Sequence, residues 1–168
     1  MKKRIMGAIL VGLMITAPIQ VEANSLSYII PEEVDDIPTE VAQNAEIIGA
    51  ELNICPELLE AIAYQESRYD PVAKNGSCKG LMQVNACHNQ RYIDAGWSPG
   101  DWDDPYKNMY VAASYLAELF DKYEDVGIVL GVYHGEKNAV AKGKSGNLSS
   151  YVTKILERSA ELERIHQK

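Results

Sequence analysis

Glu66 is the residue whose type and position in the sequence could carry acid–base chemistry. It falls on the apolar stripe of a predicted helix, because it follows Leu59, Ile62 and Ala63 at the i, i+3, i+4, i+7 spacing. A carboxylate on the core side of a helix is costly unless it is paired or protonated, and burial raises its pKa. A raised pKa suits a general acid near neutral pH. In the alternative interpretation, the carboxyl reaches solvent at the helix end or pairs with Arg68 or a lysine.

The other acids of this part of the chain have weaker patterns. Glu57 and Glu60 share the predicted helix but fall on another part of the helical wheel, away from the apolar stripe. Asp70 precedes a proline, which indicates a turn. The aspartates within 101–104 lie in a predicted loop and at a helix cap. Ordinary glycosidases use two carboxylates, so a reaction based on Glu66 alone needs a different mechanism.

Four sequence blocks resemble the motifs of the soluble lytic transglycosylase family, in the family's order. Residues 57–71 (ELLEAIAYQESRYDP) resemble its catalytic-helix motif, and residues 80–84 (GLMQV) resemble its Gly-Leu-Met-Gln block. Residues 108–116 (NMYVAASYL) resemble its Asn-containing helix, and 129–135 (VLGVYHG) its Tyr-Asn-x-Gly block. The resemblance runs over about 53–155. One block is weakly specific, whereas four ordered and correctly spaced blocks are strongly specific.

The resemblance implies a mainly α, single-domain, lysozyme-like fold of the goose-type or SLT kind. The implied activity is that of a peptidoglycan lytic transglycosylase, a carbon–oxygen lyase acting on polysaccharides. Such an enzyme cleaves the β-1,4 bond between N-acetylmuramic acid and N-acetylglucosamine and forms 1,6-anhydromuramic ends, with no metal and no organic cofactor. Two alternatives share the scaffold: a hydrolytic, lysozyme-type muramidase, and a non-catalytic protein of cell-wall binding or assembly.

The resemblance also assigns roles to individual residues. Glu66 matches the family's single catalytic glutamate, and Tyr133 matches the tyrosine expected to hydrogen-bond its carboxyl. Met82 and Gln83 match positions that line the glycan groove. Ser67 follows the glutamate and either touches substrate or holds the neighbouring loop. The pattern alone favours plainer roles: a loop-capping side chain for Gln83 and a core aromatic with a bonded hydroxyl for Tyr133.

His134 is a departure from the family pattern and completes the predicted substrate-binding set. It stands where the family usually has asparagine after the tyrosine. Histidine is larger and can become charged, so near Glu66 it could change the pH profile. A neutral supporting role is the alternative. Asn108 is expected to tie its helix to a neighbouring backbone segment.

The N-terminus resembles a secretory signal peptide. Residues 2–4 are basic, residues 5–19 are almost wholly apolar, and Ala23 ends a Val-Glu-Ala triplet with small residues at the two positions typical of a signal-peptidase site. We therefore expect a signal peptide over 1–23, an acidic lead-in over 24–38 and the lysozyme-like domain over 39–168. Secretion into the cell envelope follows, with an uncleaved anchor as the alternative.

The charge of the chain limits its partners. Removing 1–23 lowers Lys plus Arg from 16 to 13 and Asp plus Glu from 24 to 23, leaving a net charge near −10. Such a chain is repelled by nucleic acid and by anionic membrane surfaces. Binding to peptidoglycan glycan strands therefore needs a local groove. We expect a monomer, with an envelope-spanning secretion, conjugation or phage-derived machine as a possible recruiting partner.

Three cysteines, Cys55, Cys78 and Cys87, allow three disulfide pairings. The short intervening loop favours Cys78–Cys87, although no bridge at all stays open. Zinc is disfavoured, because two cysteines and His88 lack a clear fourth ligand.

Helix periodicity and capping residues predict the remaining elements. A helix capped by Thr39 carries Val41, Ala45, Ile48 and Leu52, and Pro56 begins the next, which ends at Asp70. Residues 72–80, 88–104 and 136–147 are predicted to be irregular, and 81–86 to be a short helix. Further helices are predicted over 105–123, from Asp125 to Gly135, and after a cap at Asn147 or Ser149.

Overall fold

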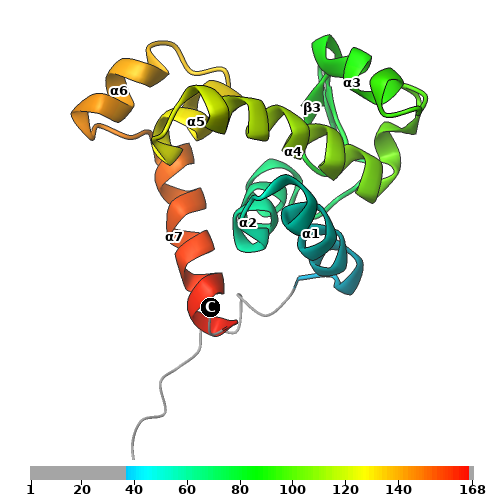
Figure 1. The fold of residues 1–168 in the computed structure, drawn as a ribbon, viewed down its shortest axis with the longest axis horizontal. Coiled ribbons are helices and arrows are strands. Elements are labelled where there is room, and N and C mark those ends of the chain that lie inside the picture. The colour runs from blue at the N-terminus through cyan, green and yellow to red at the C-terminus, as the bar shows by residue number, and fades with distance from the viewer. Residues whose placement is uncertain (1–36, 167–168) are drawn as a thin grey trace, which may run out of the picture. The chain divides into compact units, whose positions relative to one another are not determined.

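The computed structural model describes residues 37–166, which form a mainly helical domain (Figure 1). The predicted signal peptide and the lead-in up to residue 36 lie outside this part. None of the helices described is long and apolar enough to cross a membrane. The elements, in chain order, are α1 (Thr39–Leu52), α2 (Pro56–Ser67), β1 (Lys74–Asn75), β2 (Cys78–Lys79), β3 (Val84–Asn85), the 3-10 helix η1 (Ala86–His88), α3 (Asn89–Asp94), the 3-10 helix η2 (Asp101–Asp103), α4 (Pro105–Lys122), α5 (Val126–Tyr133), α6 (Ala139–Ser145) and α7 (Ser150–Ile165).

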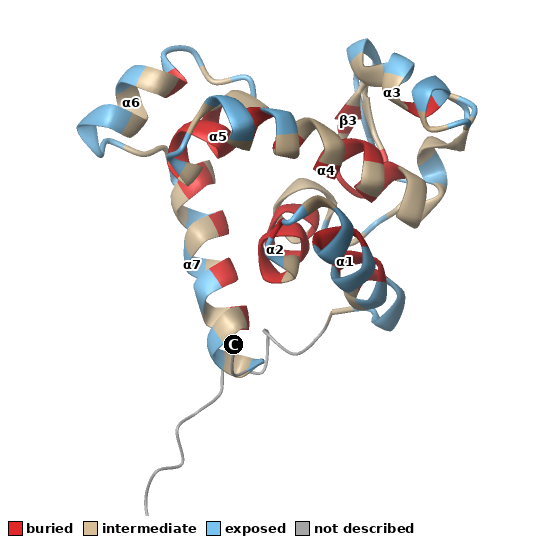
Figure 2. Ribbon diagram, viewed as in Figure 1, coloured by how far each residue is buried: buried red, intermediate tan, exposed pale blue. Residues whose placement is uncertain are grey.

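Helix α2 lies at the centre of the domain and packs against α1, α4 and α7. Figure 2 shows burial on more than one side of this helix. Leu59 and Ile62 are fully buried as predicted, but Glu57 and Glu60 are also buried, with exposed fractions of 1% and 2%. The helical wheel was therefore wrong for these two acids. A helix enclosed by three others has no solvent face, so its periodicity does not separate inside from outside.

Capping residues account for the starts of three helices. The side chains of Asp104, Asp125 and Ser149 each accept a hydrogen bond from the backbone N–H three residues onward, which begins α4, α5 and α7. These predictions are confirmed. The predicted cap at Thr39 was wrong, because Pro38 occupies the N-cap position and Thr39 is already helical.

The segment between α2 and α4 differs most from the prediction. Helix α2 ends at Ser67, because Arg68 and Tyr69 adopt left-handed backbone angles before the proline is reached. The short helix predicted over 81–86 is instead a turn followed by β3, which pairs antiparallel with β2, as β2 does with β1. Strands of two residues are too short to show an alternating pattern.

Two short helices occupy segments predicted to be irregular. Helix α3 follows η1 within 88–104, and α6 lies within 136–147. Helix α6 packs against α5 and contains Gly143, where an added Cβ would lie 2.2 Å from the Ile128 side chain. Tertiary packing, rather than local propensity, holds this seven-residue helix.

Candidate active site

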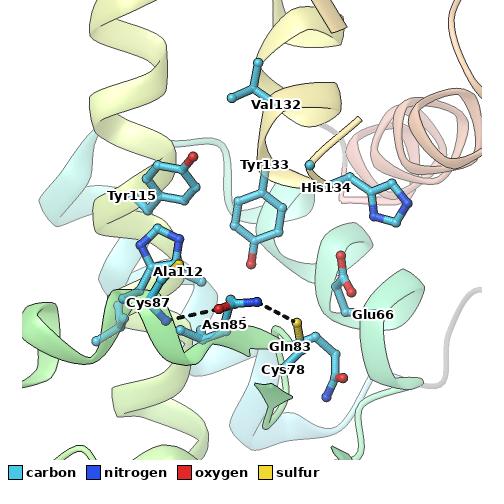
Figure 3. A pocket seen from close by; sticks show the side chains of 14 residues that line it. Glu66, Cys78, Gln83, Asn85, Cys87, Ala112, Tyr115, Val132, Tyr133 and His134 are labelled. Carbon is cyan, nitrogen blue, oxygen red and sulfur yellow. Dashed lines mark hydrogen bonds between the residues drawn. The ribbon is translucent and has the colours of Figure 1, made fainter. Parts of the chain in front are cut away.

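A cleft of about 280 Å³ opens beside the C-terminal end of α2. Figure 3 shows side chains from the sheet, α4 and α5 surrounding it, with Glu66 at one side. Among the described residues, Glu66 is the only aspartate or glutamate in its lining. The cleft is lined by Glu66, Cys78, Gln83, Val84, Asn85, Cys87, His88, Val111, Ala112, Tyr115, Val132, Tyr133, His134 and Gly135.

Glu66 occupies the last turn of α2, where its half-buried carboxyl faces the cleft. Burial raises the pKa of Glu66 above its ordinary value, because the charged form loses solvation. A hydrogen bond from Tyr151 and the charge of His134 act in the opposite direction and offset only part of this shift. The site therefore favours a carboxyl that keeps its proton to a higher pH than an exposed glutamate.

Tyr151, in the first turn of α7, donates its hydroxyl hydrogen to Glu66 Oε1 at 2.5 Å. The sequence had assigned this bond to Tyr133, and that assignment was wrong. The Tyr133 hydroxyl instead donates to the backbone oxygen of Met82 at 2.8 Å. Burial, followed by the charge of Glu66, raises the pKa of Tyr133 well above its ordinary value. The same two causes raise the pKa of Tyr151, so both phenols are neutral groups beside the acid.

His134 follows α5 and reaches the same site. Its ring stacks on that of Tyr151, with centroids 3.7 Å apart and planes 12° apart. It also lines the cleft, so the structure brings together Glu66, Tyr133 and His134 as the sequence indicated. Tyr151 is the residue that sequence reasoning missed. Its position one turn before Ile155, on the inward face of the last predicted helix, was the available signal.

Ser67, Met82 and Gln83 shape the turn beside Glu66. Ser67 Oγ donates to the backbone oxygen of Leu81 at 2.7 Å, so it holds the loop. Gln83 lines the cleft in a left-handed backbone conformation, and its side-chain amide donates to Gly80 O at 2.9 Å. The Met82 side chain has an exposed fraction of 0% and packs in the core. The structure therefore does not bring Met82 to the cleft.

Asn108 of α4 ties its helix to the backbone of the turn that contains Met82 and Gln83, as predicted. Its Oδ1 accepts the Met82 N–H at 2.8 Å, and its Nδ2 donates to Lys79 O at 3.1 Å and to the Tyr92 hydroxyl at 2.9 Å. The side chain of Asn108 is fully buried. An added Cβ at Gly80 would lie 2.3 Å from the Asn108 amide, so glycine is required for this close approach.

The side of the cleft opposite Glu66 carries a cluster of aromatic and basic side chains that the sequence did not reveal. The His88 ring lies 4.3 Å from that of Tyr115, and the Arg91 guanidinium lies 5.1 Å from the same ring. Arg91 also forms two hydrogen bonds of 2.6 Å with Glu118. Burial, and then the charge of Arg91, lowers the pKa of His88. This side therefore offers a flat aromatic surface next to a largely neutral imidazole.

The three cysteines are free thiols, so the predicted Cys78–Cys87 bridge is not formed. Cys78 pairs in register with Asn85, and Cys87 lies two residues farther on. Residues diagonal to one another across strands are roughly 7–8 Å apart, whereas a disulfide needs Cα atoms within about 7 Å. Asn85 lies between the two cysteines, donating to Cys78 Sγ at 3.5 Å and accepting the Cys87 N–H at 3.0 Å (Figure 3).

Comparison with known proteins agrees with the fold and the cleft. Residues 43–151 match the family model described as the transglycosylase SLT domain. The chain therefore belongs to this family.

Curated relatives carry two descriptions. An "X polypeptide" of Escherichia coli is 36% identical over 103 residues, which cover 56% of this chain and 60% of the relative. A "Transglycosylase" of Enterobacteria phage PRD1 is 30% identical over 111 residues, covering 65% of this chain and 39% of the relative. The chain thus spans about 60% or less of the length of these relatives.

Two solved structures share the fold. The 70 kDa soluble lytic transglycosylase of Escherichia coli superposes with a TM-score of 0.65 at 20% identity, over 77% of this chain and 25% of that one. An inactive mutant of lytic transglycosylase Slt from Pseudomonas aeruginosa gives 0.64 at 14% identity, over 78% and 25%. The domain of residues 37–166 is accordingly a mainly helical, lysozyme-like SLT domain.

Proposed function

We propose that this protein is a peptidoglycan lytic transglycosylase in which Glu66 is the catalytic acid and base. One observation carries the proposal: Glu66 is the only aspartate or glutamate among the described residues lining the cleft, and its carboxyl is half-buried beside a neutral phenol. Membership of the SLT family supports the reaction class. The substrate is the glycan strand, cut between N-acetylmuramic acid and N-acetylglucosamine.

The chemistry needs one carboxyl used twice. The protonated Glu66 gives its proton to the oxygen of the β-1,4 bond, and that bond to the muramyl C1 breaks. The resulting carboxylate then takes the proton of the muramyl C6 hydroxyl as O6 bonds to C1. A 1,6-anhydro ring closes, Glu66 regains its proton, and no water is consumed. Burial favours the first step, because it keeps the acid protonated at higher pH.

Neighbouring residues have supporting roles in this proposal. Tyr151 orients the Glu66 carboxyl through its hydrogen bond. Ser67 and Tyr133 anchor the turn that bears Gln83, by donating to the backbone oxygens of Leu81 and Met82. Gln83 then lines the cleft while its side-chain amide is held by the backbone oxygens of Ala73 and Gly80.

The hydrolytic alternative requires a second carboxylate to activate water. Glu136 is the first acidic residue after α5, but it does not line the cleft. Its carboxyl accepts hydrogen bonds from Ser149 and from Lys142, the latter at 2.9 Å. These contacts hold Glu136 in a structural ion pair, which favours the lytic reaction.

Mass spectrometry of muropeptides released from purified peptidoglycan tests the proposal. We expect products one water lighter than hydrolytic ones, and no release by Glu66→Gln. Reducing ends would establish a hydrolase instead. Binding without release would favour the non-catalytic alternative, and near-normal release by Glu66→Gln would exclude Glu66 as the acid.

Export through residues 1–23 belongs to the same proposal, because peptidoglycan lies outside the cytoplasmic membrane. The N-terminus of protein recovered from the cell envelope tests it. A chain beginning near Asn24 is expected, and a chain that retains Met1 in the membrane fraction would indicate an uncleaved anchor.

A further inference from the structure

His134 lies in a short chain of side-chain contacts that ends at the candidate acid. Its ring covers one face of the Tyr151 ring at 3.7 Å, and the hydroxyl of Tyr151 donates to Glu66. In Figure 3 the imidazole lies beside the Glu66 carboxyl, on the same side of the cleft. The histidine is thus an ionisable side chain stacked on the hydrogen-bond partner of Glu66.

Apart from Lys142, the titratable groups around the imidazole are carboxyls and phenols. Hydrogen bonds from Ser149 and Lys142 lower the pKa of a second carboxyl, that of Glu136, and the charge of His134 adds a smaller effect in the same direction. Lys142 of α6 is drawn toward Glu136 by an ion pair of 2.9 Å, and so its charge is neutralised there. The titratable groups that face this region are Glu66 from α2, Tyr133 from α5, Glu136 from the following loop, Lys142 from α6 and Tyr151 from α7.

We propose that His134 is a positioning residue whose charge controls the protonation of Glu66 in mildly acidic solution. The inference rests on the proposed function of Glu66 and adds a regulatory role to the same site. Histidine gains its positive charge as the pH falls through the range of 5 to 8. A positive charge nearby favours the carboxylate form of a glutamate. The charged imidazole therefore opposes uptake of the proton that Glu66 needs as an acid.

The effect on Glu66 has a definite direction. A positive charge on the imidazole lowers the pKa of Glu66, so it offsets part of the increase that burial causes. Asparagine, the residue usual in the family at this place, carries no charge at any pH. An enzyme with asparagine would keep the acid form of Glu66 to higher pH than this chain does.

Carbon-13 NMR of the glutamate carboxyls in the purified free protein tests this without any turnover. The Glu66 signal is assigned by its loss in Glu66→Gln. Three variants are compared with the unmodified protein: His134→Asn removes both ring and charge, His134→Phe keeps a ring over Tyr151 without charge, and His88→Asn removes another cleft histidine. We expect the Glu66 midpoint to shift upward in both His134 variants and to stay unchanged in His88→Asn.

The outcomes separate charge from packing. An unchanged Glu66 titration in both His134 variants would overturn the proposal, and so would a shift in His134→Asn alone, because the ring would then be acting by stacking. A shift shared by both variants supports it. Muropeptide release measured against pH then reports separately on the proposed function. A shifted titration without anhydro products would contradict that function while the charge control stands, and anhydro products with an unshifted titration would contradict only the charge control.

Discussion

Tyr151 and Glu66 are joined by a hydrogen bond of 2.5 Å although 85 residues separate them in the sequence. The bond connects the first turn of α7 to the last turn of α2. Helices α2 and α7 pack against each other, so this bond is fixed by the packing of two helices rather than by a loop.

Tyr151→Phe tests the value of this bond. Because the hydrogen bond lowers the pKa of Glu66, its loss should raise that pKa further and move the alkaline limb of kcat/KM upward. A hydrogen bond to a charged group contributes about 1.5–3 kcal/mol, so loss of orientation should lower kcat roughly 10- to 100-fold. Tyr123→Phe, at the end of α4, is the matched control. Equal kinetics of the two variants would show that Tyr151 does not orient the acid.

Glu66→Gln should change stability in a pH-dependent manner. The pKa of Glu66 is raised by burial, so the folded protein binds its proton more tightly than the unfolded chain does. The unmodified protein should therefore lose stability as the pH rises from about 4.5 through the folded-state pKa, since the charge must then be kept in the fold. Glu66→Gln has no carboxyl to ionise at this position, so its stability should not fall in this pH range for this reason. Thermal unfolding at pH 4 and pH 8 should show a gain for Glu66→Gln at pH 8 that shrinks at pH 4.

Asn108→Ala should loosen the turn that carries Met82 and Gln83. The substitution leaves the buried Met82 N–H and Lys79 carbonyl without their partner, at a cost of about 2–4 kcal/mol of unfolding free energy. Urea unfolding gives this value. Asn108→Asp keeps the acceptor but loses the donor, so it separates the two bonds. A change within about 0.5 kcal/mol, as expected for an ordinary surface site, would contradict this role.

Cys55 should react slowly with iodoacetamide although its residue is exposed. Burial of the thiol, together with its hydrogen bond of 3.0 Å to Glu57, raises the pKa of Cys55 to about 11. The thiolate is the reactive form, so little of it exists at pH 8. Peptide mass spectrometry of the alkylated protein gives the rate. Glu57→Gln, which removes the nearby charge, should accelerate the reaction, and a rate equal to that of a free thiol in the unmodified protein would exclude the predicted shift.

The sequence predicts elements whose signals are local. Asp104, Asp125 and Ser149 are capping residues followed by long apolar patterns, and the helices begin where these residues indicate. The three strands and the helices α3 and α6 lack such signals. They are two to seven residues long and depend on packing against other parts of the chain.

The residues of the candidate site also divide into those found from local sequence signals and those that depend on tertiary packing. Glu66 could be found because its motif and its helix lie within one short segment. The partner of Glu66 could not be chosen between Tyr133 and Tyr151, because that choice depends on how α5 and α7 pack. Met82 shows the converse case: its motif suggested the groove, but the turn held by Asn108 directs its side chain into the core.

Helix α4 has a consequence for the shape of the cleft. Its 18 residues span about 27 Å, and it packs against β3 and against α5 (Figure 1). Asn108 ties its first half to the turn of Gln83, while Leu116 and Leu119 are buried in its second half. The turn of Gln83 and helix α5, which form two walls of the cleft, are therefore both attached to the same continuous helix. A change in the separation of these two walls would have to move α4 as well, whereas exchanging side chains along the walls would reshape the cleft and leave α4 in place.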